Sequence, residues 1–427
     1  MTQPVVSSEA SSTGPSTPTS GAHRARGLAH PLRRLVVRLV QGLHEGTVTI
    51  ELPGGERIHG SGPVLGPHAT VVLHRWRPLW RLALQGDIGF ARSYRDGDWS
   101  TPDLSALLVL ASRNDAHWQA TIQGSKAMRA IDRLRHLMRR NTRRGSRENI
   151  SFHYDLGNDF YAQWLDAELI YSSALYRCDA ETLEQAQAHK LARIVELLQV
   201  DRGASVLEIG CGWGALAIAL ARDRHAHVTG LTLSTEQLAH ARERADEEGL
   251  TSRLSLRLQD YRDVGGTYDR IVSIEMLEAV GERFWPGYFE VLRSRLRPDG
   301  IAVLQVITID DAQFESYRAS ADFIQRFIFP GGMLPSWQVL QSQAGRAGLT
   351  IERHESFGQS YARTLVHWRE RFARAWPAIE AQGFDASFRR LWEYYLCYCE
   401  AGFVAGRVDV GFFRVRHAAT PGRDEQR

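Results

Sequence analysis

The chain has 427 residues, more than one ordinary domain of roughly 100–200 residues, so two or three folded units are expected. Hydrophobic residues make up 43% of it and charged residues 24%, a balance that excludes a chain disordered throughout. No run of about 18 apolar residues occurs, so we expect no membrane-spanning helix. The net charge of +3 is too small to indicate a partner by itself.

Cysteine usage and the N-terminus indicate the cellular compartment. Residues 1–30 begin with a stretch rich in Ser, Thr and Pro that lacks the apolar core of a secretory signal. We expect this segment to be a disordered tail. The cysteines fit neither a disulfide framework nor a zinc site with paired C-x-x-C ligands, which favours a cytoplasmic protein without a bound metal: Cys178, Cys211, Cys397 and Cys399.

Residues 31–125 are expected to form a small α+β unit. Pro31–Leu43 places leucines and valines at helical spacing with arginines on the other side, which predicts an amphipathic helix. Short apolar runs around a Pro-Gly-Gly turn predict strands at Thr47–Leu52, Arg57–Gly60 and Ala69–His74. No residue pattern typical of catalysis occurs here, and we expect this unit to engage lipid or a membrane.

Residues 126–148 are expected to form a basic linker helix. Between Lys126 and Arg147 the chain carries nine lysines and arginines and one acid, Asp132. Charge runs of this kind commonly form a solvated helix face. A second interpretation is a basic face on an anionic bilayer, where each arginine adds about 1 kcal/mol of binding. No motif for nucleic acid accompanies the run, so nucleic acid is not an expected partner.

From residue 205 the pattern changes to strands that alternate with helices, within a catalytic region expected to cover residues 149–420. Helices are expected from Trp213, from Ser234 and through Phe284–Leu296. This alternation predicts an α/β unit with a parallel sheet, helices on both faces and a ligand at the carboxyl ends of the strands. The expected strands are Ser205–Ile209, His227–Leu233, Leu254–Leu258, Arg270–Ile274 and Ile301–Ile307.

A glycine-rich turn follows the first of these strands, with Gly210, Gly212 and Gly214 in a G-x-G-x-G pattern. Glycine lets the backbone adopt positive φ and lets a ligand approach the main chain closely. Dinucleotide enzymes instead use G-x-G-x-x-G and a carboxylate closing the second strand, and this chain has neither. Glu208, just before the turn, favours S-adenosylmethionine, because a carboxylate there can order the loop and face the cationic methionine end.

Several motifs, in order along the chain, resemble the cyclopropane-fatty-acid synthase family, which includes the mycolic acid methyltransferases. They are Phe152–Phe160, Tyr171–Tyr176, Leu207–Gly214, Leu231–Gln237, Gln259–Asp263, Asp269–Ser273, Phe327–Gly332, Leu334–Ser336 and Tyr394–Leu396. The resemblance covers residues 149–413 and, more weakly, 86–104. It implies a Rossmann-like class I methyltransferase sheet, S-adenosylmethionine as methyl donor and unsaturated phospholipid acyl chains as substrate.

The resemblance also implies which residues contact the cofactor. Matched by position, they are Tyr171, Ser172, Gly210, Gly212, Gly214, Thr232 and Gln237, with Tyr261 and Arg262 flanking the adenine. Glu208 joins this set from the argument on the turn. Without the resemblance, Tyr171 and Tyr261 are more typical of an ordinary aromatic core.

Methyl transfer to an alkene needs a strong electrophile, a water-free pocket and a base that removes a proton from the carbocation. Sulfonium supplies the electrophile, and aromatic faces can hold the cation. In the family the base is thought to be a bicarbonate held by a Cys, a Glu, a His, a backbone amide and a Tyr. Glu278 and Tyr361 match the Glu and the Tyr. Ser173 and Gln305 stand at the Cys and His positions, and Ala279 replaces a common His.

These departures leave two outcomes open. Either a rearranged set of donors retains bicarbonate, or Glu278 itself accepts the proton after burial raises its pKa. Glu278→Gln is then expected to abolish product and leave cofactor binding intact. The combination of Ala279 and Gln305 most resembles the family branch that makes methylene- or methyl-branched (tuberculostearic-type) chains, so the product also stays open.

Two further features carry alternatives. Cys399 stands where family descriptions mark an active cysteine, but the apolar run around it is typical of a buried, inert thiol. A separate apolar helical face either lines an acyl tunnel or packs in the core: Phe323, Ile324, Phe327 and Ile328.

Together these patterns predict a cytoplasmic methyltransferase that associates peripherally with the inner face of the membrane. It adds a methylene or methyl carbon across the double bond of unsaturated phospholipid acyl chains. The bilayer surface is the expected partner, and a homodimer and a reductase partner are left open. Two alternatives remain: a methyltransferase for small molecules, and a lipid-binding protein without activity.

Overall fold

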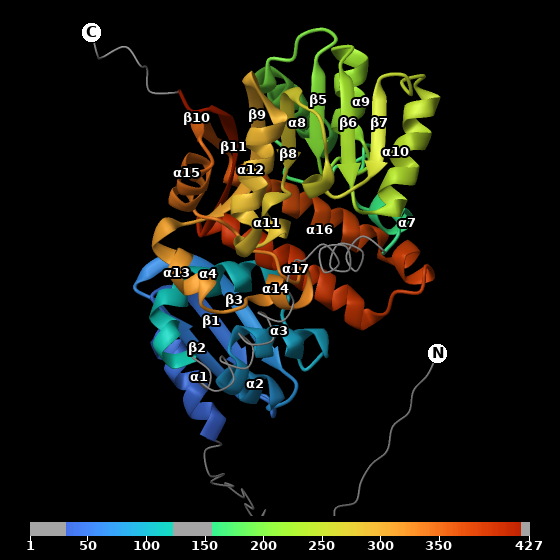
Figure 1. The fold of residues 1–427 in the computed structure, drawn as a ribbon. Coiled ribbons are helices and arrows are strands. Elements are labelled where there is room, and N and C mark those ends of the chain that lie inside the picture. Colours follow the sequence, from blue (N-terminus) through green and yellow to red (C-terminus); the bar gives the residue numbers. More distant parts are fainter. Residues whose placement is uncertain (1–30, 123–155, 420–427) are drawn as a thin grey trace, which may run out of the picture.

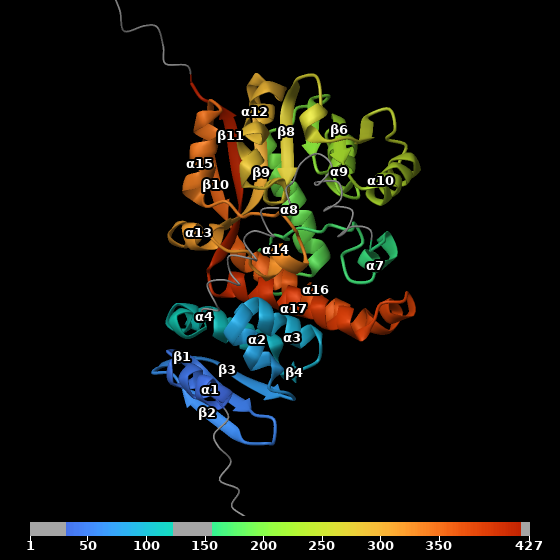
Figure 2. The same cartoon turned by 60° about the horizontal axis from the view of Figure 1, so that its bottom comes forward.

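The computed structural model describes residues 31–122 and 156–419 (Figure 1). The expected tail, the basic segment 126–148 and the start of the Phe152–Phe160 motif lie outside the described residues, so their structures stay predictions. The described residues form an N-terminal α+β unit and a larger unit built on a seven-stranded sheet. Two long helices, α16 (Gly358–Ala381) and α17 (Ala386–Val404), lie between the two units in both views (Figures 1 and 2).

The N-terminal unit contains a four-stranded sheet in the order β2-β1-β3-β4, in which β1 and β3 are parallel. Alternate side chains of β3, from Ala69, Val71 and Leu73, are buried because one face of this strand packs on α4. The elements are α1 (Pro31–Gln41), β1 (Glu45–Glu51), β2 (Arg57–Ser61), β3 (Val64–Leu73), α2 (Arg77–Gln85), α3 (Asp87–Arg95), β4 (Trp99–Ser100) and α4 (Leu104–Ile122). The predicted helix and the three predicted strands are confirmed, although β3 begins earlier than expected.

The seven-stranded sheet has the order β10-β11-β9-β8-β5-β6-β7. The five predicted strands are confirmed and are parallel: β5 (Ser205–Ile209), β6 (His227–Thr232), β7 (Leu254–Leu258), β8 (Tyr268–Ile274) and β9 (Leu296–Ile309). Two further strands, which were not predicted, extend the parallel part of the sheet at one edge. There β11 (Val408–His417) runs antiparallel to β9, and β10 (Leu349–Ser356) runs antiparallel to β11.

Helices cover both faces of this sheet, as predicted. Alternation along β5 sends Leu207 and Ile209 into one core and Val206 into the other. The first core contains α12 (Trp285–Arg295) and α15 (Trp337–Arg346). The second contains residues of α8 (Leu183–Leu198), α9 (Ala215–Asp223) and α10 (Thr235–Glu247).

Short elements connect these layers near the ends of the strands. They are α7 (Asn158–Ala162), the 3₁₀ helix η1 (Tyr261–Asp263), α11 (Leu277–Val280), the 3₁₀ helix η2 (Glu282–Phe284), α13 (Asp311–Arg318) and α14 (Phe323–Phe327). Of these, α7, α13 and α14 lie near the level where the sheet meets the long helices, in both views (Figures 1 and 2).

An aromatic core holds α16 and α17 together and fixes them under the sheet. The rings of Phe160 and Trp392 have centroids 5.0 Å apart, and those of Trp164 and Trp368 are 5.7 Å apart. Helix α17 also contacts α3 and α4, so it joins the two units. None of the described helices has both the length and the apolar composition needed to span a bilayer.

Candidate active site

A cavity of about 870 Å³ lies at the carboxyl ends of β5, β6, β8 and β9 and extends into the N-terminal unit. Its volume falls in the range of small-molecule sites. The turn after β5 and the end of β6 form one part of the wall. The N-terminal unit contributes an apolar part, which includes Val40 of α1, Val48 and Ile50 of β1, Val71 of β3, Leu79 of α2 and Leu107 of α4.

The glycine-rich turn presents main chain to this cavity. Gly210 and Gly212 line it with φ values of +85° and +53°. A Cβ added at Gly212 would meet no atom within 4 Å, so this glycine leaves open space beside the backbone. A Cβ at Gly214 would come within 3.0 Å of the Cβ of Ala241, so Gly214, which is not on the cavity wall, allows α9 to pack on α10.

The end of β6 and the first turn of α10 each supply one polar side chain to the wall. Thr232 and Gln237 are buried and line the cavity, and Thr232 Oγ1 donates a hydrogen bond to Gln237 Oε1 over 2.8 Å. Ser234 caps α10 by accepting a hydrogen bond from the backbone N–H of Gln237, which fixes the start of the helix. This pair therefore lies where the sequence expected cofactor contacts.

Tyr261 and Arg262 have different positions. Tyr261 is buried and lines the cavity, with its ring packed against Tyr288 at a centroid distance of 5.5 Å. Arg262 is not on the cavity wall. Its guanidinium donates two hydrogen bonds to Asp260, at 2.8 and 2.5 Å, and lies 5.6 Å from the centroid of the Tyr261 ring. Arg262 therefore packs against the ring of Tyr261 and does not reach the cavity.

Tyr171 and Ser172 also line the cavity. The hydroxyl groups of Tyr171 and Tyr395 form a hydrogen bond of 2.8 Å. Ser172 Oγ accepts a hydrogen bond of 2.7 Å from Nζ of Lys190, a buried lysine that sequence reasoning missed. A lysine inside an amphipathic helix gives no signal of its burial until the helix is packed.

Glu208 and Lys190 are buried ionisable groups of opposite charge in the cavity wall. Burial raises the pKa of Glu208 to about 8 and lowers the pKa of Lys190 to about 8, and the charge of each partly offsets the shift of the other. Glu208 Oε2 has no hydrogen-bond partner among the described residues. A buried carboxylate oxygen without a donor is suited to a cationic ligand.

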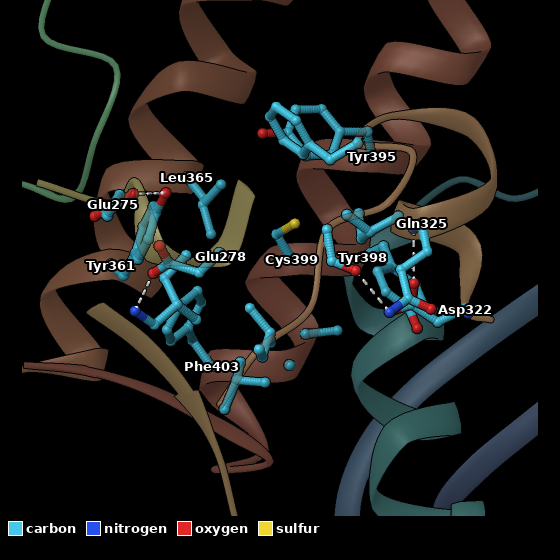
Figure 3. A pocket seen from close by; sticks show the side chains of 18 of the residues that line it. Glu275, Glu278, Asp322, Gln325, Tyr361, Leu365, Tyr395, Tyr398, Cys399 and Phe403 are labelled. Carbon is cyan, nitrogen blue, oxygen red and sulfur yellow. Dashed lines mark hydrogen bonds between the residues drawn. The ribbon is translucent and has the colours of Figure 1, made fainter. Parts of the chain in front are cut away.

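Glu278, in α11, lines the cavity near its centre (Figure 3). Its Oε1 accepts a hydrogen bond of 2.5 Å from the backbone N–H of Ile307, and its Oε2 has no partner among the described residues. Burial, followed by the negative charge of Glu275, raises the pKa of Glu278 to about 8. Glu278 is therefore protonated at neutral pH.

Glu275, which sequence reasoning missed, also lines the cavity, directly after β8. Its Oε1 accepts hydrogen bonds from the backbone N–H of Ser173 (2.8 Å) and from Nε2 of Gln305 (2.7 Å). Its Oε2 accepts one from the hydroxyl of Tyr361 (2.8 Å; Figure 3). Three of the predicted catalytic residues thus converge on a carboxylate that was not predicted.

Ser173 and Gln305 are fully buried and are not on the cavity wall, whereas Tyr361 is. The hydroxyl of Ser173 donates to the carbonyl of Ala174, so only its backbone N–H serves Glu275. The predicted catalytic group therefore divides. Glu278, Tyr361 and Cys399 face the cavity, and Ser173 and Gln305 act on it through Glu275.

Cys399, in α17, points into the open space between the Glu278 side of the cavity and the rings of Tyr395 and Tyr398 (Figure 3). Burial raises the pKa of its thiol well above the ordinary value, with smaller contributions from Asp322 and Glu275. A thiol that stays protonated is a poor nucleophile. Its position suits contact with a ligand, and its chemistry does not suit covalent attack.

The apolar face predicted in and after α14 only partly lines the cavity. Ile324 is on the wall, whereas Phe323 packs between Tyr394 and Tyr398, with ring centroids 4.8 and 5.4 Å away. Phe327 is not on the wall and lies beneath the guanidinium of Arg95, 6.0 Å from its ring centroid. A tunnel interpretation that rests on Phe323 and Phe327 is therefore wrong, because α14 is only one turn long and turns these side chains toward α3 and α17.

Comparison with known proteins identifies the family. A family model described as mycolic acid cyclopropane synthetase matches residues 141–413. The chain belongs to this family. It is 39% identical over 413 residues to a tuberculostearic acid methyltransferase of Mycobacterium tuberculosis, covering 93% of this chain and 91% of that protein.

Other family members show the same relation. The chain is 36% identical over 334 residues to the cyclopropane-fatty-acyl-phospholipid synthase of Escherichia coli, covering 77% of this chain and 83% of that protein. The crystal structure of the mycolic acid cyclopropane synthase CmaA1 complexed with SAH and CTAB superimposes with a TM-score of 0.60. It is 30% identical and covers 63% of this chain and 97% of that one.

Family membership confirms the predicted class I methyltransferase fold, the enzyme class and S-adenosylmethionine as methyl donor. The roles of individual residues and the binding of bicarbonate stay predictions. The residues that sequence reasoning missed are Lys190 and Glu275. Glu275 lies three residues before the predicted Glu278, and its role depends on a turn that no local pattern indicates.

Proposed function

We propose that the chain transfers one carbon from S-adenosylmethionine to the double bond of unsaturated acyl chains in membrane phospholipids. The observation that carries this proposal is the cavity that runs from the glycine turn, past two carboxylates, to the apolar wall of the N-terminal unit. A methyltransferase that acts on small polar substrates would not need that apolar extension. An acyl chain does, because burying its methylenes contributes roughly 0.8 kcal/mol each.

The cofactor end of the cavity fits S-adenosylmethionine. The open space beside Gly212, the paired side chains of Thr232 and Gln237 and the ring of Tyr261 would hold it. Glu208, which lacks a donor at Oε2, would face its cationic methionine end. Bound there, the sulfonium supplies an electrophilic methyl group, which a poorly nucleophilic alkene requires.

The central part of the cavity suits a transient carbocation. Tyr361, Tyr395, Tyr398 and Phe403 surround this part with aromatic rings (Figure 3). An aromatic face stabilises a desolvated cation by about 2 kcal/mol or more. These residues would also exclude water, which would otherwise capture the cation as an alcohol.

The product is set by whether the proton leaves the new methyl group before or after a hydride shift. Loss from the new methyl group closes a cyclopropane ring, and loss after a hydride shift leaves a branched chain. The 39% identity to a tuberculostearic acid methyltransferase favours the branched product. A methylene branch would then need a reductase, which supplies a hydride.

A homodimer remains a prediction that light scattering tests.

We further propose that the protein binds the inner face of the membrane peripherally, through the N-terminal unit. Helix α2 exposes Trp80 (50%) and Leu84 (48%) on its outer face, while Leu79 and Leu82 face the cavity. Arg77 and Arg81, on the same helix, form ion pairs with Asp98 and Asp96 over 2.5 and 2.7 Å, so the apolar side chains carry the proposed contact. An amphipathic helix of this kind can lie in a membrane interface and admit an acyl chain past its inner face.

The test is labelled methyl transfer by the purified protein. Vesicles with monounsaturated phospholipid should acquire label from S-adenosyl[methyl-¹⁴C]methionine, and matched vesicles with saturated chains should not. Label in a water-soluble product but not in lipid would favour a small-molecule methyltransferase. Binding of vesicles and cofactor without any transfer would indicate a lipid-binding protein without activity.

A further inference from the structure

We infer that the carboxylate of Glu275 takes the place of the bicarbonate that the family resemblance implies, and that it accepts the proton in the reaction. The identity of the substrate in this inference rests on the proposed function. The choice of Glu275 as the proton acceptor rests on the geometry around that residue. It goes beyond the two outcomes left open by the sequence, which were bicarbonate or Glu278.

The first argument is that three of the expected bicarbonate ligands are already bound to Glu275. Ser173 and Gln305, at the Cys and His positions of the family, each donate to Oε1 of Glu275, and Tyr361 donates to Oε2. Tyr361 has one hydroxyl proton, and that proton is engaged. A bicarbonate in this place would have to displace the carboxylate from all three donors.

The second argument is electrostatic. A bicarbonate would be a second anion beside the carboxylate of Glu275 in a site of low dielectric, where like charges repel strongly. Lys190 is the cation whose charge acts on Glu275 there, and its charge also acts on Glu208 and Asp166. The residues present therefore do not fit a bound bicarbonate.

The third argument decides between the two glutamates. Glu275 accepts three hydrogen bonds, which stabilise its ionised form, whereas Glu278 accepts one and leaves Oε2 without a donor. Two nearby carboxylates do not ionise together in such a site, so the better solvated one holds the charge. Burial raises the pKa of both groups, but the three donors lower that of Glu275, so Glu275 is the carboxylate of the pair and Glu278 the neutral acid beside it.

The backbone of Glu275 supports a functional position. Its φ is +48°, a conformation that costs a non-glycine residue of order 1 kcal/mol or more. The backbone N–H of Glu275 donates to the carbonyl of Gln305 over 2.8 Å, which holds the strained residue beside β9. The turn directs the carboxylate to the donors and the cavity.

The chemical step is balanced without a further reactant. One C–H bond of the acyl carbocation breaks, and its electron pair forms the last C–C bond of a cyclopropane ring or the C=C bond of a methylene branch. The proton binds an oxygen of Glu275, which becomes a carboxylic acid. After the product leaves, Glu275 returns the proton to water that enters the cavity.

Three substitutions test this assignment. Glu275→Gln keeps the shape but removes the charge, and we expect at least ~100-fold loss of methyl transfer, the usual contribution of a general base. Glu275→Gly removes the side chain at a position whose positive φ glycine tolerates. Added bicarbonate can then take the place of the lost carboxylate and should raise the methyl-transfer rate of this variant about tenfold. Glu278→Gln should lose less activity than Glu275→Gln. Glu282→Gln, on η2, removes a half-buried carboxylate that pairs with Arg318 and is not on the cavity wall, and it serves as the matched control.

Bicarbonate binding gives a result that does not depend on turnover. By ¹³C NMR with [¹³C]bicarbonate, we expect binding to Glu275→Gly but not to the unaltered protein or to Glu275→Gln. Unaltered protein that binds bicarbonate, or loses activity in bicarbonate-depleted buffer, overturns the inference. So does a Glu275→Gln variant with nearly full activity. If the unaltered protein methylates no lipid, the proposed function fails, and the NMR result still decides whether Glu275 occupies the anion site.

Discussion

At the scale of single residues, the site is a set of buried ionisable groups whose environments differ. Glu208, Glu275, Glu278 and Lys190 all line one cavity. Of these four groups, only Glu275 accepts the hydrogen bonds from Ser173, Gln305 and Tyr361. The consequence is a division of roles, with one carboxylate for the cofactor, one for the proton and one kept neutral.

Glu208 gives a prediction about pH. Its pKa in the free protein is raised to about 8 by burial, so it is mostly protonated at neutral pH. Binding of a cation favours its ionised form, and S-adenosylmethionine affinity should therefore rise as pH rises through about 8. Glu208→Gln should bind roughly tenfold more weakly above this pH, equal to ~1.4 kcal/mol, with a flatter pH dependence. Calorimetry below and above about pH 8 measures the affinity of each protein for S-adenosylmethionine and its pH dependence. Equal affinities of the unaltered protein and Glu208→Gln at high pH would exclude a contact between Glu208 and the cofactor.

Cys399 gives a second prediction. Because its thiol is protonated and a direct methyl transfer forms no covalent enzyme intermediate, Cys399→Ser should lower the rate no more than a few-fold. The rate of lipid methylation measures this. A loss as large as that of Glu275→Gln would restore Cys399 as a catalytic residue.

Sequence reasoning at this scale identified residues that lie together where a motif fixes the position. The residues of this kind that line the cavity are Gly210, Gly212, Thr232, Gln237, Tyr261, Glu278 and Tyr361, and their roles stay predictions. It failed at Glu275, because the hydrogen bonds of that residue come from positions 173, 305 and 361, which only the folded chain brings together.

At the scale of elements, the five parallel strands of the larger sheet were predicted, and its two antiparallel strands, β10 and β11, were not. Strand β10 has a largely exposed, polar sequence and lies at the sheet edge, so it gave no clear signal. Strand β11 follows α17, far along the chain from β9, its partner in the sheet. Helix α14 shows the same limit, because helical spacing identifies a face but not the neighbour it meets.

Helix α2 carries the element-scale prediction. Trp80→Glu combined with Leu84→Glu should reduce co-sedimentation with anionic vesicles roughly tenfold or more, because burial of two large apolar side chains is lost. S-adenosylmethionine affinity should not change. Leu258→Glu, at an exposed leucine (40%) on the sheet, is the control and should sediment as the unaltered protein does. Full vesicle binding by the double variant would place membrane contact elsewhere.

At the scale of the whole molecule, the cavity belongs to neither unit alone. Its cofactor end comes from the sheet and its apolar wall from the N-terminal unit, and α17 contacts both units between them. Composition and motifs indicated the two units, but a shared cavity depends on how they pack. This arrangement explains why a lipid methyltransferase carries an N-terminal unit without catalytic residues.

The most direct measurement uses S-adenosylmethionine with a fully deuterated methyl group and vesicles of monounsaturated phospholipid. Mass spectrometry of the acyl chains should show one added carbon that retains two of its three deuterons, because the proton acceptor takes the third as a ring or a methylene branch forms. Acyl chains of unchanged mass, with a protein that binds the cofactor normally, would contradict the account.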